Sequence, residues 1–245
     1  STMSDIANKV ETLMEAMPYL QKYQGKIIVI KYGGNAMINE ELKDAVMHDV
    51  VLLKLLGMKP VLSHGGGPGI NKMLEKLNIP VEFIEGLRYT SADIMRVVEM
   101  VLVGQVNTEL VGFINKLGGK AVGLSGVSGD IYHCHQRDEV HGYVGDIDYV
   151  DPKPIFAMLD AGYIPVIAPV GTDGQGHTFN INGDTAAGKL ASALGAEKLV
   201  ILTDIEGLCN DIKIRDVISY LNIEDVKALK DKGTIAGGMI PKVDC

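Results

Sequence analysis

Ile27-Ile28-Val29-Ile30-Lys31-Tyr32-Gly33-Gly34-Asn35 joins a short apolar run to a glycine-rich turn, and Pro60-Val61-Leu62-Ser63-His64-Gly65-Gly66-Gly67-Pro68 repeats the pattern farther along the chain. Each stretch predicts a buried strand, a turn and then a helix. Such turns lie at the carboxyl ends of parallel strands, where α/β proteins bind ligands. Glycine N–H groups and helix N-termini attract phosphate oxygens, and Lys31 adds a positive charge. Both stretches therefore indicate phosphate chemistry.

Strand patterns and helical patterns alternate along most of the chain. Strands are predicted at 27–30, 60–63, 81–84, 121–124, 163–170 and 198–203, and helices at 39–56, 66–77, 91–117, 152–161, 185–194 and 224–232. Residues 126–150 interrupt the alternation with patterns typical of hairpins in a mixed or antiparallel patch. The alternation predicts an α/β protein, a three-layer αβα sandwich around a mainly parallel central sheet.

Residues 4–20 predict an amphipathic helix in front of the first strand, and we expect Pro18 to end or kink it. Its apolar stripe contains Ile6, Val10, Leu13, Met14 and Met17. Two interpretations stay open, because the stripe would serve equally to pack the helix on its own domain or to contact another subunit.

The composition limits the possible partners. A chain of 245 residues with a net charge of −8 lacks the basic surface that sequence-independent nucleic-acid binding needs, but a local basic pocket can still hold a small anion. No segment is expected to span a membrane, and three cysteines without paired spacing indicate a reducing compartment. We therefore expect a cytoplasmic protein without nucleic-acid or membrane partners.

Two further stretches of the sequence partly match other kinds of site, a P-loop and a metal site. Gly183-Asp184-Thr185-Ala186-Ala187-Gly188-Lys189 begins like a phosphate-binding P-loop, but Leu190 replaces the magnesium-binding hydroxyl and no strand leads into it. His133 and His135 alternate along a predicted strand, yet no further ligands with zinc-like spacing accompany them. We therefore expect a surface hairpin there, and no metal site. Each glycine turn, taken alone, also fits a purely structural turn.

Five segments, taken in order, resemble the amino acid kinase family: Lys31–Gly34, His64–Pro68, Gly86–Thr90, Asn180–Asp184 and Gly238–Lys242. The resemblance covers nearly the whole chain, from Ile27 to Lys242. As a set, the segments are most similar to the branch of the family whose acceptor is N-acetyl-L-glutamate.

The resemblance implies a role for each matching residue. Lys31 and Lys242 would bracket the transferred phosphoryl group, with Asp184 holding both lysines. Backbone N–H groups of Gly33, Gly34 and Gly65 would bind phosphoryl oxygens, and substrate would be bound by Gly66, Gly67, Arg88 and Asn180, the last two at its α-carboxylate. The nucleotide pocket would be lined by Thr203, Asp204, Glu206, Gly207, Leu208, Thr234, Ile235 and Ala236.

The implied reaction is ATP-dependent phosphorylation of the side-chain carboxylate of N-acetyl-L-glutamate to N-acetyl-glutamyl 5-phosphate, in arginine biosynthesis, with Mg²⁺ carried on ATP. The residue types suit it, because phosphoryl transfer mainly requires positioning and charge neutralisation. An ionised carboxylate needs no general base. Two alternatives remain: another acyl-phosphate-forming amino acid kinase, or a catalytically silent amino-acid-sensing domain of the same fold.

The resemblance also implies three regions: an N-terminal helix at 1–24, an acyl-substrate lobe at 25–178 and a nucleotide lobe at 179–245. Because the chain ends at Cys245, soon after Lys242, we expect the nucleotide lobe to be truncated. Gly183 departs from the family pattern, where an alanine is usual. The N-terminal helix resembles one that joins dimers into hexamers in arginine-sensitive members, which implies a homodimer or hexamer and feedback inhibition by arginine.

Overall fold

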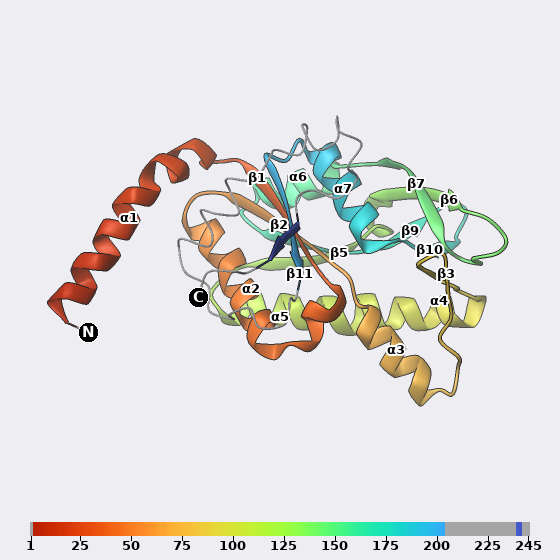
Figure 1. The fold of residues 1–245 in the computed structure, drawn as a ribbon. Helices are drawn as coiled ribbons and strands as arrows, with labels where there is room; N and C mark the ends of the chain where they lie inside the picture. The colour runs from red at the N-terminus through yellow and green to blue at the C-terminus, as the bar shows by residue number, and fades with distance from the viewer. Residues whose placement is uncertain (1, 204–238, 242–245) are drawn as a thin grey trace.

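A parallel sheet forms the centre of the protein, as the computed structural model shows for residues 2–203 and 239–241, the residues it describes (Figure 1). Within those residues the strand order is β12-β11-β1-β2-β8-β5, and every neighbouring pair is parallel. The strands are β1 (Ile27–Tyr32), β2 (Lys59–His64), β5 (Ala121–Ser125), β8 (Ile164–Ala168), β11 (Lys198–Thr203) and β12 (Met239–Pro241). The first two glycine turns therefore follow adjacent strands and lie at the same edge.

The central strands bury both of their faces, because alternate residues point to opposite sides of a sheet. Ile28 and Ile30 of β1 belong to one hydrophobic core, and Val29 belongs to the other. Figure 1 shows helices on both sides of the sheet, which gives the three predicted layers. The fold class expected from the sequence is confirmed.

Helices α2 (Glu40–Leu55) and α3 (Gly67–Lys76) cover one face, together with a long helix made of α4 (Ala92–Glu99), the π-helical segment η2 (Met100–Asn107) and α5 (Thr108–Lys116). The other face is covered by α6 (Lys153–Asp160) and α7 (Gly183–Leu194). Short 3₁₀ turns η1 (Gly34–Ile38) and η3 (Ser128–Asp130) follow β1 and β5. Every helix predicted between residues 39 and 194 is present, with ends shifted by one or two residues.

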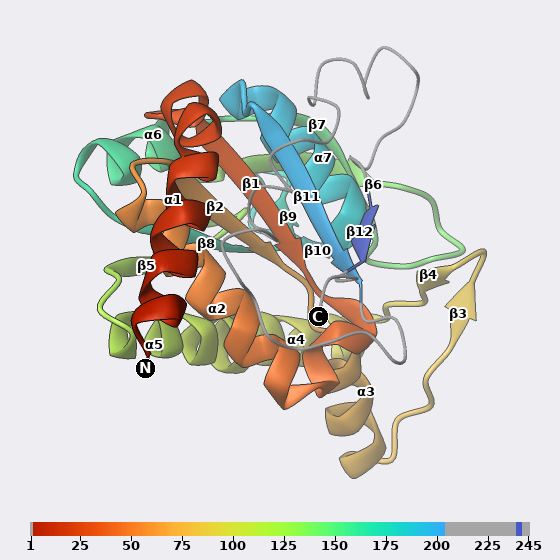
Figure 2. The same cartoon turned by 60° about the vertical axis from the view of Figure 1, so that its left-hand side comes forward.

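A smaller sheet and a hairpin complete the fold near the carboxyl edge of the central strands. The smaller sheet has the order β10-β9-β6-β7, with β6 (Tyr132–Gln136), β7 (Gly145–Val150), β9 (Val170–Thr172) and β10 (Thr178–Asn180). The pairs β6–β7 and β9–β10 are antiparallel, and one parallel contact between β6 and β9 connects them. This sheet contains the mixed patch that was predicted for residues 126–150. The hairpin of β3 (Phe83–Ile84) and β4 (Leu87–Arg88) extends beyond the central sheet (Figure 2).

Three local predictions differ from the structure. Helix α1 (Met3–Tyr23) continues past Pro18, so of the two outcomes expected at this residue, an end or a kink, the helix does not end there. The strand predicted at 81–84 is the hairpin β3–β4, because Gly86 at φ 80° allows the chain to reverse. The strand predicted at 163–170 breaks at Pro169, which has no N–H for a sheet, and β9 continues in the smaller sheet. The helix predicted at 224–232 lies outside the described residues.

The long helix from Ala92 to Lys116 has the length and composition of a membrane span. The expectation that no segment resembles one was therefore wrong for this helix. Its apolar residues have a partner in the fold, because Val98, Leu102 and Leu110 are buried in the core shared with α2 and α3. A core helix of this kind passes the same test of composition, so the composition of the segment alone does not assign it to a membrane.

Candidate active site

Lys31 and Asp184 form an ion pair at the carboxyl edge of the sheet, with Nζ 2.9 Å from Oδ1. Lys31 is close to the end of β1, and Asp184 lies in the first turn of α7. Gly33 leaves room for the lysine, since a Cβ at Gly33 would lie 2.9 Å from Nζ. The pair places a largely buried cation beside a helix N-terminus, which itself carries partial positive charge.

The two glycine turns contact each other through their backbones. Gly65 N–H donates to the carbonyl of Tyr32 over 2.9 Å, and a Cβ at Gly33 would lie 3.2 Å from Gly65 Cα. Gly66 caps helix α3, and a Cβ there would lie 2.3 Å from Leu102 Cδ2. Larger residues at these positions would separate the turns from each other and from the long helix, so glycine is required for the close approach.

A buried histidine lies behind the second turn. His64 Nδ1 is 2.8 Å from the carbonyl oxygen of Gly65, and Nε2 is 3.0 Å from Nδ2 of Asn107. Because a carbonyl only accepts, Nδ1 carries the ring proton and Nε2 accepts from the amide. Burial lowers the pKa of His64 to about 4, partly opposed by the Gly65 hydrogen bond and assisted by the charge of Lys31. The ring is therefore neutral.

Arg88 reaches the site from β4 and is almost fully buried. Its Nη2 donates to the carbonyl of Gly67 over 3.3 Å, and its guanidinium lies 4.8 Å from the centre of the Phe83 ring. Among the described residues, nothing accepts a hydrogen bond from Nη1. Burial lowers the pKa of Arg88, although an arginine stays charged at neutral pH. A buried cation with an unused donor is suited to an anionic ligand.

Asn180 is linked to Arg88 through one threonine. Its Nδ2 donates to Thr90 Oγ1 over 3.3 Å, and that hydroxyl donates to the carbonyl of Arg88 over 2.9 Å. Beyond Asn180 the chain turns at Asn182, whose side chain caps α7 by accepting from the N–H of Thr185. The Asn180–Asp184 segment therefore supplies a polar side chain, a helix N-terminus and the carboxylate that pairs with Lys31.

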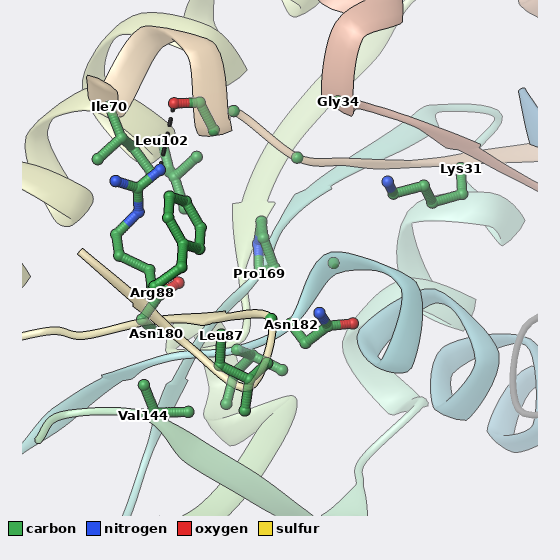
Figure 3. Close-up of a pocket in the computed structure, with 17 residues that line it drawn as sticks. Lys31, Gly34, Ile70, Leu87, Arg88, Leu102, Val144, Pro169, Asn180 and Asn182 are labelled. Atoms are coloured by element: carbon green, nitrogen blue, oxygen red, sulfur yellow. Dashed lines mark hydrogen bonds between the residues drawn. The ribbon is translucent and has the colours of Figure 1, made fainter. Parts of the chain in front are cut away.

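These groups enclose one pocket of about 210 Å³. Figure 3 shows Lys31 at one side of it and Arg88 at the other, with Asn180 beside Arg88 and Asn182 nearer to Lys31. Of the residues predicted for catalysis and binding, the lining includes Lys31, Gly34, Gly65, Gly66, Gly67, Arg88 and Asn180. Gly33 lies next to the pocket and leaves room for the Lys31 side chain, and Asp184 holds Lys31 through the ion pair. The structure thus brings together predicted residues from four of the five segments, those that begin at Lys31, His64, Gly86 and Asn180.

Other predicted site residues are not placed. Lys242 and the nucleotide-pocket residues Asp204, Glu206, Gly207, Leu208, Thr234, Ile235 and Ala236 lie outside the described residues, and Thr203 is described only as the last residue of β11. Phe83, Leu102 and Asn107 were missed by the sequence reasoning. A single asparagine directly after the apolar run of η2 is the signal that would have drawn attention to Asn107.

The alternative sites have little support in the described part of the chain. Contrary to the expectation that no strand leads into the Gly183–Lys189 stretch, β10 ends at Asn180 just before it, but the whole stretch is part of helix α7 and not a phosphate-binding loop, and Lys189 is exposed. His133 pairs with Asp130 and His135 with Asp148, and residues 2–203 and 239–241 contain no group of three acidic, histidine or cysteine side chains arranged for a metal. Burial, with nearby aspartates, raises the pKa of Cys134 to about 12, which leaves its thiol unreactive.

Comparisons with known proteins agree with this arrangement. Residues 26–245 match the model of the amino acid kinase family. Acetylglutamate kinase of Heliobacterium modesticaldum is 51% identical over 97% of this chain and 85% of its own length. The same enzyme of Carboxydothermus hydrogenoformans is 48% identical over 99% of this chain and 86% of its own length.

Two solved structures have a similar fold. A protein of Streptococcus mutans UA159 has a TM-score of 0.69 and 27% identity, covering 89% of this chain and 95% of its own. N-acetylglutamate synthase of Neisseria gonorrhoeae, complexed with coenzyme A and N-acetyl-glutamate, has a TM-score of 0.70 and 27% identity, covering 81% of this chain and 46% of the synthase.

Proposed function

The chain belongs to the amino acid kinase family, and from that premise we propose that the pocket between Lys31 and Arg88 binds its acceptor substrate. The chain is a kinase that phosphorylates N-acetyl-L-glutamate, a reaction of arginine biosynthesis, as its similarity to curated acetylglutamate kinases supports. The roles of individual residues in that reaction are our proposal, and the arrangement of charges in the pocket supports them.

The charges in the pocket match those of the acceptor. N-acetyl-L-glutamate has two carboxylates at the two ends of a short chain, and the pocket has Arg88 on one side and Lys31 on the other (Figure 3). The planar guanidinium suits the α-carboxylate because it can donate two parallel hydrogen bonds. Asn180, joined to Arg88 through Thr90, would bind the same end. The side-chain carboxylate then extends toward Lys31 and the glycine turns.

The reaction forms one bond and breaks one bond. The side-chain carboxylate of the substrate attacks the γ-phosphorus of ATP, and the bond from that phosphorus to the bridging oxygen of the β-phosphate breaks, releasing ADP. Lys31 would neutralise charge on the transferred phosphoryl oxygens while Asp184 holds its ammonium in place. The N–H groups of the glycine turns after β1 and β2, at Gly33, Gly34, Gly65, Gly66 and Gly67, would donate to the same oxygens and to the substrate.

ATP enters this proposal as a substrate that brings its own Mg²⁺. Magnesium prefers phosphate oxygens and water to a cage of protein ligands, and Asp184, which follows the pocket residue Gly183, already pairs with Lys31. We assign Lys242 to the other side of the phosphoryl group, and the predicted segments from Thr203 to Leu208 and from Thr234 to Ala236 to the nucleotide. Residues 25–178 would then form the acyl-substrate half, and residues 179–245 the nucleotide half.

Helix α1 supports a further part of the proposal, a contact between subunits. Only Ala16, Leu20 and Tyr23 of this helix are buried on their own domain, and the helix projects from the body of the protein in Figure 1. Its remaining apolar stripe is exposed: Ile6, Val10, Leu13, Met14 and Met17. A homodimer or hexamer would cover this stripe, and arginine would act on such an assembly as a feedback inhibitor.

The decisive experiment measures ADP release with Mg²⁺-ATP and N-acetyl-L-glutamate and traps the product with hydroxylamine. An acyl phosphate reacts to give a hydroxamate, so ADP and hydroxamate should appear in equal amounts. L-glutamate, whose free amine replaces the acetamide, is the control acceptor. ADP release without hydroxamate would refute the acyl-phosphate product, and faster turnover of another acylated amino acid would favour the alternative acceptor. No release with any acceptor would favour a sensing domain.

A further inference from the structure

A hydrogen-bond network joins the long helix to the glycine turn of the pocket, and none of its polar side chains lines the pocket. Asn107 Nδ2 contacts Nε2 of His64 at 3.0 Å, the carbonyl of Val166 at 3.0 Å and the carbonyl of Leu124 at 3.3 Å. One amide nitrogen thus contacts three neighbouring strands of the sheet, β2 at its last residue, β8 at its centre and β5 near its end. An amide turned the other way would place its oxygen against two carbonyl oxygens, so this orientation of Asn107 is fixed by its surroundings.

The orientation of Asn107 determines the tautomer of His64. Since Nδ2 can only donate, Nε2 must accept and the ring proton stays on Nδ1. That proton is donated to the carbonyl of Gly65. The carbonyl of Gly65 and the N–H of Gly66 belong to one planar trans peptide, in which they point in opposite directions. Holding the carbonyl toward the buried ring therefore turns the N–H of Gly66 away from it, and Gly66 lines the pocket.

The π-helical geometry of η2 explains how Asn107 reaches this position. In an α-helix of about 3.6 residues per turn, residues five apart point about 140° away from each other. In a π-helix, residues five apart are joined by a backbone hydrogen bond and lie on the same side. Leu102 and Asn107 are five apart in η2, and both contact the second turn: Leu102 packs over Gly66, and Asn107 bonds to His64.

We propose that Asn107 and His64 are positioning residues, which hold the N–H of Gly66 toward the transferred phosphoryl group, and that η2 is π-helical because it must present Asn107 beside Leu102. One part of this proposal rests on the proposed function, namely that the group bound by the N–H of Gly66 is the transferred phosphoryl group. The tautomer of His64 and the direction of the Gly65–Gly66 peptide are inferred without it.

Two substitutions at His64 separate the halves of the network. The amide nitrogen of His64→Asn can occupy the position of Nδ1 and keep the bond to Gly65, whereas the amide of His64→Gln occupies the position of Nε2 and keeps only the contact with Asn107. We expect His64→Gln to lower kcat by about 30-fold, and His64→Asn by less than about threefold, because a peptide shifted by a fraction of an ångström loses transition-state binding. KM for N-acetyl-L-glutamate should change by less than about threefold in both.

Equal losses of kcat in the two variants, or a larger loss in His64→Asn, would overturn the proposal. His48→Gln, at an exposed histidine of α2, is the matched control and should retain wild-type kcat. Circular dichroism and melting temperature show whether each variant is folded.

A second measurement is independent of catalysis, and its result is obtained from the wild-type protein. NMR of the ring nitrogens of the wild-type protein should show His64, identified by its disappearance in His64→Asn, as the neutral tautomer protonated at Nδ1. A ring protonated at Nε2 would overturn the proposal even if the kinetics agreed. A wild-type protein that has the expected tautomer but releases no ADP would contradict the proposed function and leave the peptide orientation supported.

Discussion

Nζ of Lys31 lies 2.9 Å from Oδ1 of Asp184, although one belongs to the first strand of the sheet and the other to its last described helix. The lysine side chain is largely buried and the aspartate is half exposed, so water could replace the lysine as partner of the carboxylate more easily than it could replace the carboxylate as partner of the lysine. The geometry restrains the ammonium at one point of the pocket wall. A fixed charge is effective in phosphoryl transfer because it needs no reorganisation during the reaction.

Replacement of Lys31 should therefore act on turnover. We expect Lys31→Met, which keeps the apolar stem, to lower kcat by about 100-fold or more, and Asp184→Asn by about tenfold, because the second variant keeps the cation and loses only its restraint. Steady-state assays with Mg²⁺-ATP and N-acetyl-L-glutamate measure both. Lys189→Met, at an exposed lysine of the same helix, is the control and should behave as wild type. A larger effect of Asp184→Asn than of Lys31→Met would contradict these roles.

Arg88 should act on binding of the acceptor. Arg88→Lys keeps a positive charge but loses the two-pronged donor and the contact with Phe83, so we expect KM for N-acetyl-L-glutamate to rise by about 10- to 100-fold while kcat changes little. KM for ATP should stay constant. Arg96→Lys, at an exposed position of α4, provides the control. An unchanged KM for the acceptor would remove Arg88 from the binding site.

Much of this site could be predicted from local sequence, because strand–turn–helix patterns are local. The alternation around Lys31 and His64 predicts two parallel strands. The turns that follow adjacent parallel strands lie at the same edge of the sheet, so the contact between Gly33 and Gly65 follows from the pattern. The pairing of Lys31 with Asp184 has no local signal. It was predicted only from the resemblance to a family.

The features that were missed depend on contacts between distant residues. Nothing in the helical periodicity of residues 91–117 distinguishes a π-helical segment from an α-helix, because the widening is stabilised by tertiary contacts of Leu102 and Asn107. Likewise, the sequence from 163 to 170 is one apolar run, so its pattern does not show that Pro169 separates two strands, β8 and β9. Pro18 does not end α1, which leaves a kink as the other outcome that the sequence predicts there.

Gly183 offers a stabilising substitution. It begins α7 without a positive φ, and a Cβ there would meet Lys31 Cε at an ordinary 3.4 Å. Gly183→Ala should raise the free energy of unfolding by about 0.5–1 kcal/mol, because alanine loses less backbone entropy in a helix. The melting temperature should rise by a few degrees, with kcat within about twofold of wild type. Gly66→Ala is the contrasting variant and should destabilise, since its Cβ would lie 2.3 Å from Leu102 Cδ2. A lower melting temperature for Gly183→Ala would show that the space is not available.

His64 should make the stability of the protein depend on acid pH. Burial lowers its pKa to about 4, whereas a histidine in the unfolded chain titrates near 6.5. Between these values the unfolded state binds more protons, so the free energy of unfolding falls as the pH falls. The contribution is complete above the unfolded pKa, and about 3 kcal/mol of it is lost by pH 4. Urea unfolding of wild type and His64→Asn across this range isolates the contribution, because other groups titrate in both proteins. As the pH drops, the free energy of unfolding of the wild type should fall more than that of His64→Asn. A difference between the two proteins that stays constant would mean that His64 is not held neutral by the fold.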